Sequence, residues 1–290
     1  MMLVTDEEKK IRLPFSRGIL TRSIMLAGID VGLAYAIASE VQRELEGAAK
    51  RVVSTDEIRE LTYRKLLEKG LREQAERYLL WRKLKRRKIR IAILIGGATG
   101  VGKSTISTEI AFRLGIRSII GTDTIREVMR KMIAPDLLPD IHVSSFLAGE
   151  AVNPPAEVDP LIYGFGMQVK HVSTGIEAVL ERSRREGFNT LIEGIHVVPG
   201  FVDLKGNEFM YLITVPDRDY LEGHFYERAR YSLRDPRKYI ENIDRIMEIQ
   251  DYLIKLARKH GVPIVENVEL EKTVERIISD VIRRLEKSRG

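Results

Sequence analysis

The chain has 290 residues, of which 44% are hydrophobic and 31% are charged; it carries a formal net charge of +6 and contains no cysteine. This length and apolar content suffice for one large domain or two smaller ones and exclude a largely disordered protein. The lack of cysteine excludes disulfides, thiolate metal sites and cysteine nucleophiles, and it predicts a cytoplasmic location in a reducing compartment. High charge combined with little Asn and Gln is typical of thermophilic proteins rich in surface ion pairs.

The first part of the chain, from residue 4 to about residue 70, shows helical spacing of its apolar residues. Residues 17–30 and 31–45 are each predicted to be helical. A further helix is predicted to begin near Ser54 or Thr55, either of which is a suitable N-cap. We therefore predict a small, mainly helical domain.

Two features of this region bear on possible partners. The apolar residues 24–38 include Asp30 and are too few to span a bilayer, so no membrane segment is expected. A charged helix predicted at residues 71–90 ends in a basic run, residues 82–90, and the net charge permits anionic partners such as nucleic acid. However, only Trp81 adjoins the run and no aromatic residue lies within it, so base stacking has no platform. We interpret the run as the solvated end of a connecting helix and expect no nucleic-acid partner.

From residue 88 onward, short apolar runs alternate with helical or irregular stretches. This alternation is typical of an α/β domain with a mainly parallel sheet covered by helices on both faces. The first helices of this domain are expected at Lys103 to about Leu114 and from near Thr124. We predict two domains, a helical domain with its connector at residues 1–88 and an α/β domain at residues 89–290. The predicted strands are residues 89–97, 118–122, 189–194, 208–215 and 262–267.

Residues 97–104 read G-x-x-x-x-G-K-S directly after the first predicted strand, which is the context that a phosphate-binding P-loop (Walker A motif) requires. Glycines let successive backbone N–H groups point at the β-phosphate, and the helix N-terminus adds positive potential. Lys103 is expected to neutralise the β- and γ-phosphates of ATP, and Ser104 to bind Mg²⁺. The alternative is a glycine turn with a purely structural role. The order of strand, loop and helix favours the P-loop over this alternative. The expected ATP-binding residues are Gly97, Ala98, Thr99, Gly100, Val101, Gly102, Lys103, Ser104 and Thr105.

The second predicted strand is followed at once by Asp123, with Arg126 and Arg130 at helical spacing after it. Residues at this end of a parallel strand lie at the edge of the sheet where substrates bind. Asp123 is suited to orient or deprotonate an attacking hydroxyl, and the arginines are suited to bind an anionic substrate. This layout predicts a small-molecule phosphotransferase. The alternative makes Asp123 a helix N-cap and Arg126 a surface residue, and the cap and substrate roles can coexist.

The third predicted strand ends at Glu193, close to where P-loop proteins keep an acid that holds Mg²⁺ through water or positions the nucleophile. Asp123 and Glu193 are both candidate bases, and a loose transition state needs little base catalysis from either. His196 is a candidate substrate contact, with a structural role as the alternative. The Asn/Thr-Lys-x-Asp stretch with which a GTPase reads its base is absent from the sequence.

Residues 217–239 contain many arginine side chains, and this cluster of positive charge predicts a lid that closes on ATP and excludes water. Arg228, one turn after His224, is the candidate catalytic arginine. We expect it to contact a phosphate or the adenine of ATP. The alternative is a solvated basic helix. The proline- and glycine-rich residues 147–166 are predicted to form a mobile loop over the acceptor site.

Taken together, four stretches resemble the archaeal 2-phosphoglycerate kinase family of P-loop kinases, with the similarity running from about Ile89 to the C-terminus. The resemblance implies transfer of phosphate from ATP to the 3-hydroxyl of 2-phosphoglycerate, which gives 2,3-bisphosphoglycerate. The P-loop matches the family motif residue by residue, whereas Asp123, Arg126 and Glu193 rest on their positions alone. The four stretches are residues 96–107, 119–130, 190–201 and 224–257.

The N-terminal region has a resemblance of its own. Residues 11–28 and 53–70 are similar to the ATP-cone, a small module that binds adenine nucleotides as allosteric effectors. An effector site is therefore one expectation for this domain. A docking or dimerisation role is the other, and the sequence leaves the oligomeric state open.

Other functions remain open from the sequence. A P-loop kinase of a polyol or nucleoside is the nearest alternative, although the arginines near Asp123 favour an anionic, phosphorylated acceptor. A nucleotide-sensing regulator with little turnover is an alternative from another class. For the kinase we expect direct in-line transfer from ATP–Mg²⁺ without a covalent enzyme intermediate.

Overall fold

A computed structural model describes residues 2–6, 11–48, 51–86, 89–230 and 235–287. The chain divides into two compact units. One comprises Met1–Ile89, Phe112–Leu114 and Ile278–Gly290, and the other comprises Arg90–Ala111 and Gly115–Ile277. The functional domain boundary between residues 88 and 89 stays a prediction. Of the basic run at residues 82–90, the side chains of residues 83–88 lie outside the described part. No helix among the described residues is long and apolar enough to cross a membrane.

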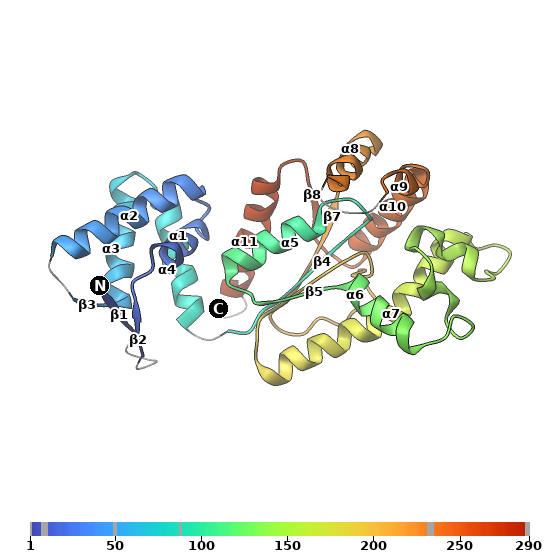
Figure 1. Cartoon of the computed structure of the whole chain (residues 1–290), viewed down its shortest axis with the longest axis horizontal. Helices are drawn as coiled ribbons and strands as arrows, with labels where there is room; N and C mark the ends of the chain where they lie inside the picture. Colours follow the sequence, from blue (N-terminus) through green and yellow to red (C-terminus); the bar gives the residue numbers. More distant parts are fainter. Residues whose placement is uncertain (1, 7–10, 49–50, 87–88, 231–234, 288–290) are drawn as a thin grey trace. The chain divides into compact units, whose positions relative to one another are not determined.

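The first unit contains a small sheet as well as helices (Figure 1). Its strands are β1 (Leu3–Asp6), β2 (Ile11–Pro14) and β3 (Val52–Ser54). The strand order is β2-β1-β3, with β1 antiparallel to β2 and parallel to β3. These strands are too short to show a period-2 pattern, and β1 pairs with β3 across almost fifty residues, which is why helical spacing alone did not reveal them.

Helices nevertheless dominate this unit, as predicted. They are α1 (Arg17–Met25), α2 (Val31–Gly47), α3 (Thr55–Glu68) and α4 (Arg72–Arg86). Ser54 is the N-cap of α3 and forms a capping box with Glu57, in which each side chain accepts from the other residue's backbone N–H. Ile24, Ile37 and Leu66 are buried in the core that these helices share.

The second unit is built on a five-stranded sheet in the order β5-β6-β4-β7-β8, and every neighbouring pair is parallel. Every residue of β4 and β7 is buried, which explains the continuous apolar sequence of β4 and of residues 209–213 in β7. The strands are β4 (Ala92–Gly97), β5 (Ser118–Gly121), β6 (Thr190–Glu193), β7 (Glu208–Thr214) and β8 (Ile264–Glu266).

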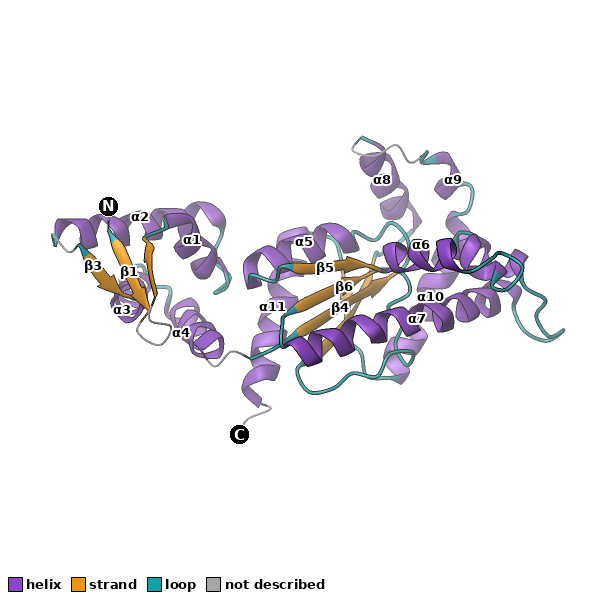
Figure 2. Ribbon diagram, turned by 60° about the horizontal axis from the view of Figure 1, so that its bottom comes forward, coloured by secondary structure: helices purple, strands orange, loops and turns teal. Residues whose placement is uncertain are grey.

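Helices cover both faces of this sheet (Figure 2). On one face, Ile176 and Leu180 of α7 pack with Leu94, Ile192 and Met210 of the three central strands. Figure 1 shows α5 on the opposite face. The helices are α6 (Thr122–Met132), α7 (Pro160–Glu186), α8 (Arg218–Ala229), α9 (Arg237–Ile240) and α10 (Ile243–Lys259), together with α5 (Lys103–Leu114) and α11 (Leu270–Lys287), whose residues 112–114 and 278–287 belong to the first unit. Two 3₁₀ helices, η1 (Pro139–His142) and η2 (Ser145–Ala151), precede α7.

The proline- and glycine-rich residues 147–166 differ from the predicted mobile loop. Their first part belongs to η2, and α7 begins at Pro160 with Asp159 as its N-cap. Proline at the first helical position has no N–H to lose from the hydrogen-bond ladder. Gly164 lets α7 approach η2 closely, because a Cβ there would lie 2.3 Å from the carbonyl oxygen of Ala148. The prediction of a loop was wrong for residues 147–151 and 160–166, because here proline starts a helix and glycine permits packing, whereas residues 152–159 belong to neither helix nor strand.

Candidate active site

The carboxyl ends of three adjacent strands form the centre of the site. β6 lies between β5 and β4, and Glu193 at its end pairs in register with Ile95 on one side and Gly121 on the other. β4 leads into the P-loop, and β5 leads into Thr122 and Asp123. The topology therefore brings together the nucleotide loop, Glu193 and the start of α6, although they are far apart in the sequence.

The P-loop turns sharply between β4 and α5. Gly97, Gly100 and Gly102 have φ angles of 147°, 92° and 89°, a region that favours glycine. A Cβ on Gly97 would also lie 2.4 Å from the carbonyl oxygen of Ile213. The Lys103 Nζ donates to the carbonyl oxygen of Ala98 at 2.6 Å, so its ammonium group lies over the loop. The loop, the following helix and the lysine form the arrangement that binds nucleotide phosphates.

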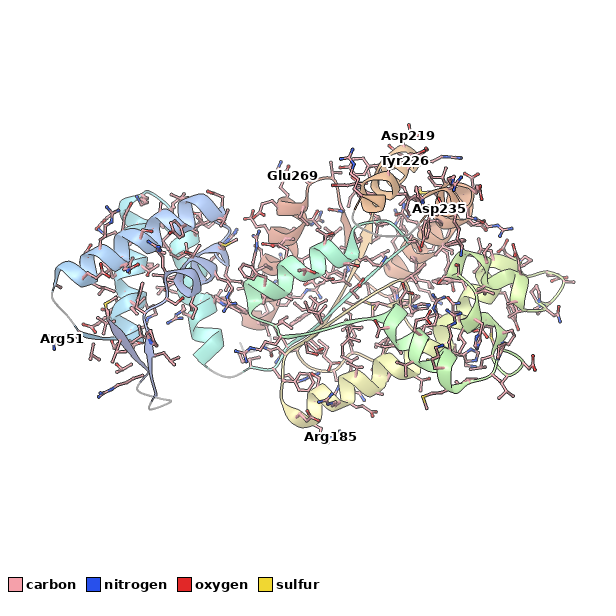
Figure 3. The ribbon with its side chains drawn as sticks, viewed as in Figure 1. Arg51, Arg185, Asp219, Tyr226, Asp235 and Glu269 are labelled. Carbon is pink, nitrogen blue, oxygen red and sulfur yellow. The ribbon has the colours of Figure 1, made fainter. Side chains whose placement is uncertain are left out.

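Two side chains from distant elements hold this loop from behind. The Asn267 Nδ2, just after β8, donates to the Val101 carbonyl oxygen at 3.0 Å, and the His224 Nδ1 on α8 lies 2.9 Å from the Gly100 carbonyl oxygen. A Cβ on Gly100 would come within 2.5 Å of the Phe225 ring, so α8 packs closely on the loop. Asp219 and Tyr226 of α8, which are labelled in Figure 3, are exposed.

Ser104 and Glu193 meet at the metal position predicted from the sequence. The Ser104 Oγ donates to the Glu193 Oε1 at 3.0 Å. Both groups are hard oxygen donors, which Mg²⁺ prefers. No group of three or more His, Cys, Asp or Glu residues that could hold a metal occurs in the described part of the chain. Two protein oxygens beside a phosphate-binding loop fit Mg²⁺, which usually keeps several waters and binds substrate phosphates.

Asp123 and Arg126 lie on the first turns of α6. The N-cap of this helix is Gly121, so the alternative interpretation of Asp123 as the N-cap was wrong. The Asp123 side chain is 55% exposed, and the Arg126 Nη2 lies 3.5 Å from its Oδ1. Arg126 is 13% exposed, not a surface residue, and its Nη1 donates to the Val143 carbonyl oxygen at 2.6 Å. This pairing places an accessible carboxylate beside a guanidinium group near the carboxyl end of β5.

Arg130, one turn further along α6, pairs with Glu127 at 2.5 Å. Among the described residues, the buried Nε atoms of Arg126 and Arg130 have no hydrogen-bond partner. Because these Nε atoms are closed to solvent, an anion would have to bind the outer guanidinium nitrogens, and the Arg130 side chain is 33% exposed.

His196 does not take the predicted role of a substrate contact. It is fully buried, its Nδ1 lies 2.9 Å from the Thr122 Oγ1, and its Nε2 lies 3.0 Å from the Gln168 Oε1. Burial lowers its pKa to about 3, with the nearby Asp123 opposing this shift and Arg126 and Lys103 adding to it. The structure contradicts the substrate contact because protein groups occupy both ring nitrogens.

The predicted lid, residues 217–239, comprises α8, α9 and the segment between them. Arg228 belongs to α8, but its side chain lies outside the described residues, as do residues 231–234. Arg218 forms an exposed ion pair with Asp244, and Arg237 forms one with Asp235. These two pairs agree with the alternative of a solvated basic surface for those arginines, and the lid role of Arg228 stays a prediction.

The sequence did not point to Gln168 and Asn267. Both are buried amides that hold backbone carbonyls of the site. Gln168 lies on the buried face of α7. A polar residue among the apolar positions of a predicted helix was the signal that could have marked it.

A parallel sheet with a P-loop after its central strand and a carboxylate at the end of the neighbouring strand defines a P-loop phosphotransferase. Relatives narrow this class. Proteins named 2-phosphoglycerate kinase are 72% identical in Thermococcus kodakarensis, covering 99% of each chain, and 57% identical in Pyrococcus furiosus, covering 98% of this chain and 94% of the relative. A third, from Methanothermobacter thermautotrophicus, is 42% identical and covers 98% of this chain and 95% of the relative. The chain belongs to the 2-phosphoglycerate kinase family, which confirms the resemblance and the predicted enzyme class, an ATP-dependent kinase.

The N-terminal resemblance is confirmed as well, because residues 7–87 match the ATP cone domain family model. Among solved structures, TT1252 from Thermus thermophilus is 19% identical with a TM-score of 0.43, covering 68% of this chain and 98% of that chain. This structural similarity is too low to add to the argument.

Proposed function

We propose that this protein transfers the γ-phosphoryl group of ATP to the 3-hydroxyl of 2-phosphoglycerate, giving 2,3-bisphosphoglycerate and ADP. The observation that carries the proposal is the meeting of the P-loop, Glu193 and the Asp123–Arg126 pair at three adjacent strand ends. The named relatives support this acceptor. In 2-phosphoglycerate the 2-oxygen already carries phosphate, so the 3-hydroxyl is the remaining alcohol.

ATP lies on residues 97–105 in this proposal. The loop amides and the N-terminus of α5 bind the β-phosphate, and Lys103 neutralises charge on the β- and γ-phosphates. Ser104 and Glu193 would hold Mg²⁺, directly or through water, and the ion would neutralise charge on the phosphate oxygens. Asn267 and His224 keep the loop in place through the Val101 and Gly100 carbonyls.

The acceptor lies beside α6. Arg126 and Arg130 bind its phosphate or carboxylate through their guanidinium groups, which project from the same helix at a spacing of one turn. Since Glu193 is engaged by Ser104, we assign Asp123 to orient the 3-hydroxyl and to accept its proton if base catalysis is needed. The hydroxyl then attacks the γ-phosphorus in line, the bond to the ADP oxygen breaks, and no covalent enzyme intermediate forms.

The N-terminal domain binds an adenine nucleotide as an effector in this proposal, and the match of residues 7–87 to the ATP cone domain supports it. Equilibrium dialysis of the full chain with a non-hydrolysable ATP analogue is expected to give two bound nucleotides per chain. One bound nucleotide would leave this domain with a structural role.

The kinase proposal is tested by ATP consumption with Mg²⁺ at elevated temperature in the presence of 2-phosphoglycerate, 3-phosphoglycerate, glycerate, a polyol or a nucleoside. Strong acceleration by 2-phosphoglycerate alone is expected. Faster consumption with a polyol or nucleoside, or equally slow hydrolysis with every compound, would contradict the proposed acceptor.

A further inference from the structure

A buried polar network lies beneath the acceptor side of the site, with Gln168 of α7 at its centre. Gln168 is fully buried and its amide makes four contacts. Its Nε2 donates to the carbonyl oxygens of Asp140 at 2.5 Å and Val143 at 3.2 Å. Its Oε1 accepts from the Ser145 hydroxyl at 2.6 Å and faces the His196 Nε2 at 3.0 Å. All the hydrogen-bonding capacity of the amide is used.

These contacts fix the direction of each hydrogen bond. The two backbone carbonyls can only accept, so they require the NH₂ group of Gln168, and its oxygen must face His196. His196 therefore carries its proton on Nε2 and donates it to Gln168. Its Nδ1 is then an acceptor, and the Thr122 hydroxyl donates to it at 2.9 Å. A neutral ring agrees with the lowered pKa of His196, which burial causes.

Thr122 connects this network to the catalytic end of the sheet. It is the first residue of α6, directly before Asp123, and it is fully buried. Gly194, directly after Glu193, leaves space for it, because a Cβ on Gly194 would lie 1.8 Å from the Thr122 Oγ1. The start of α6 is thus held between Gly194 and the His196 ring.

The other branch of the network reaches Arg126. The Val143 carbonyl oxygen that accepts from Gln168 also accepts from the Arg126 Nη1 at 2.6 Å. The Gln168 side chain therefore supports both residues of α6 that are candidates for binding the acceptor substrate. It acts on Asp123 through His196 and Thr122, and on Arg126 through the Val143 carbonyl.

We propose that Gln168 and His196 are positioning residues that fix Asp123 and Arg126 relative to Glu193 and the P-loop, and so set the affinity for the acceptor. This inference rests on the proposed function for the identity of the acceptor. Neither residue touches substrate. A histidine suits the position because its neutral ring accepts a hydrogen bond on one side and donates one on the other.

Thr122 offers a matched pair of variants that keep the buried shape. Thr122→Val removes the hydroxyl without changing the volume much, whereas Thr122→Ser keeps it. The Val variant is expected to raise the KM for 2-phosphoglycerate about tenfold, as the loss of one buried hydrogen bond implies. Its KM for ATP should stay within about twofold of the wild-type value by the same reasoning, since the hydrogen bond that is lost joins Thr122 to His196 and not to the P-loop. The Ser variant should restore the wild-type acceptor KM.

His196 gives a second comparison. Glutamine also presents an acceptor and a donor, so His196→Gln is expected to retain more acceptor affinity than His196→Leu. A merely structural network would lower the melting temperature of these variants and leave both KM values of the folded enzyme unchanged. A wild-type acceptor KM in Thr122→Val, or an equal rise in both KM values, would overturn the inference.

Amide hydrogen exchange of residues 122–126 separates this inference from the proposed function, because it needs no acceptor. We expect exchange in Thr122→Val to be about tenfold faster than in Thr122→Ser, as the lost hydrogen bond implies. Equal exchange in the two variants would overturn the positioning role. Absence of wild-type turnover with 2-phosphoglycerate would instead overturn the acceptor and leave the exchange result to decide the network's role.

Discussion

Among single residues, Glu193 is the proposed Mg²⁺ ligand that supplies the negative charge. Replacing it by glutamine keeps the size and removes the charge that faces Ser104. We expect Glu193→Gln to lower activity at a fixed Mg²⁺ concentration by about 10–100-fold and to shift the Mg²⁺ dependence to higher concentration. A Mg²⁺ titration of the initial rate measures both effects.

The matched control is Glu186→Gln, the same change at an exposed carboxylate near the end of α7, paired with Arg182. Its Mg²⁺ dependence should equal that of the wild type. An unchanged dependence in Glu193→Gln as well would remove Glu193 from the metal site.

The burial of His196 predicts how the free energy of unfolding depends on pH. Burial lowers its pKa from 6.5 to about 3 in the folded chain. Between these values the unfolded chain takes up a proton that the folded chain refuses, so the free energy of unfolding falls as the pH falls, by about 1.4 kcal/mol per pH unit from this residue. Chemical denaturation from pH 7 to pH 4 should therefore show a shallower decline for His196→Gln than for the wild type. Parallel curves would contradict a buried, neutral His196.

Among the helices, alanine substitutions at two glycines of α7 distinguish the effect of close packing on stability from the effect of helix propensity. A Cβ on Gly164 would meet the backbone of Ala148, whereas a Cβ on Gly166 would meet nothing within 4 Å. Gly166→Ala should raise the free energy of unfolding by up to about 1 kcal/mol through helix propensity alone. Gly164→Ala should lower it by about 1–3 kcal/mol because η2 must move.

Thermal unfolding of the two variants, each compared with the wild type, measures the difference. An equal change in both would mean that η2 does not pack against the first turns of α7 as described.

Elements with a strong local signal were predictable from the sequence. The predicted helix from Lys103 to about Leu114 is α5, and of the two predicted N-caps, Ser54 and Thr55, the structure has Ser54. The failures have a common cause. The strands of the first unit and the close approach of Gly164 to η2 depend on partners distant in the sequence, which local periodicity and composition do not contain.

At the scale of the whole molecule, the same distinction applies to the site. The P-loop was predictable because its residues are consecutive, and the Ser104–Glu193 meeting followed from the rule that parallel strands end at one edge. The supporting network was not, because Gln168 contacts four residues in two stretches distant in the sequence, residues 140–145 and His196. His196 was assigned to substrate for the same reason, since its partners are invisible in sequence.

Phosphorus NMR of a reaction that contains ATP, Mg²⁺ and 2-phosphoglycerate would follow the proposed phosphoryl transfer itself. We expect a new phosphate ester on the 3-oxygen, formed in equal amount with ADP, while the resonance of the 2-phosphate persists in a shifted position. ADP accompanied by inorganic phosphate, with 2-phosphoglycerate unchanged, would contradict the proposed transfer.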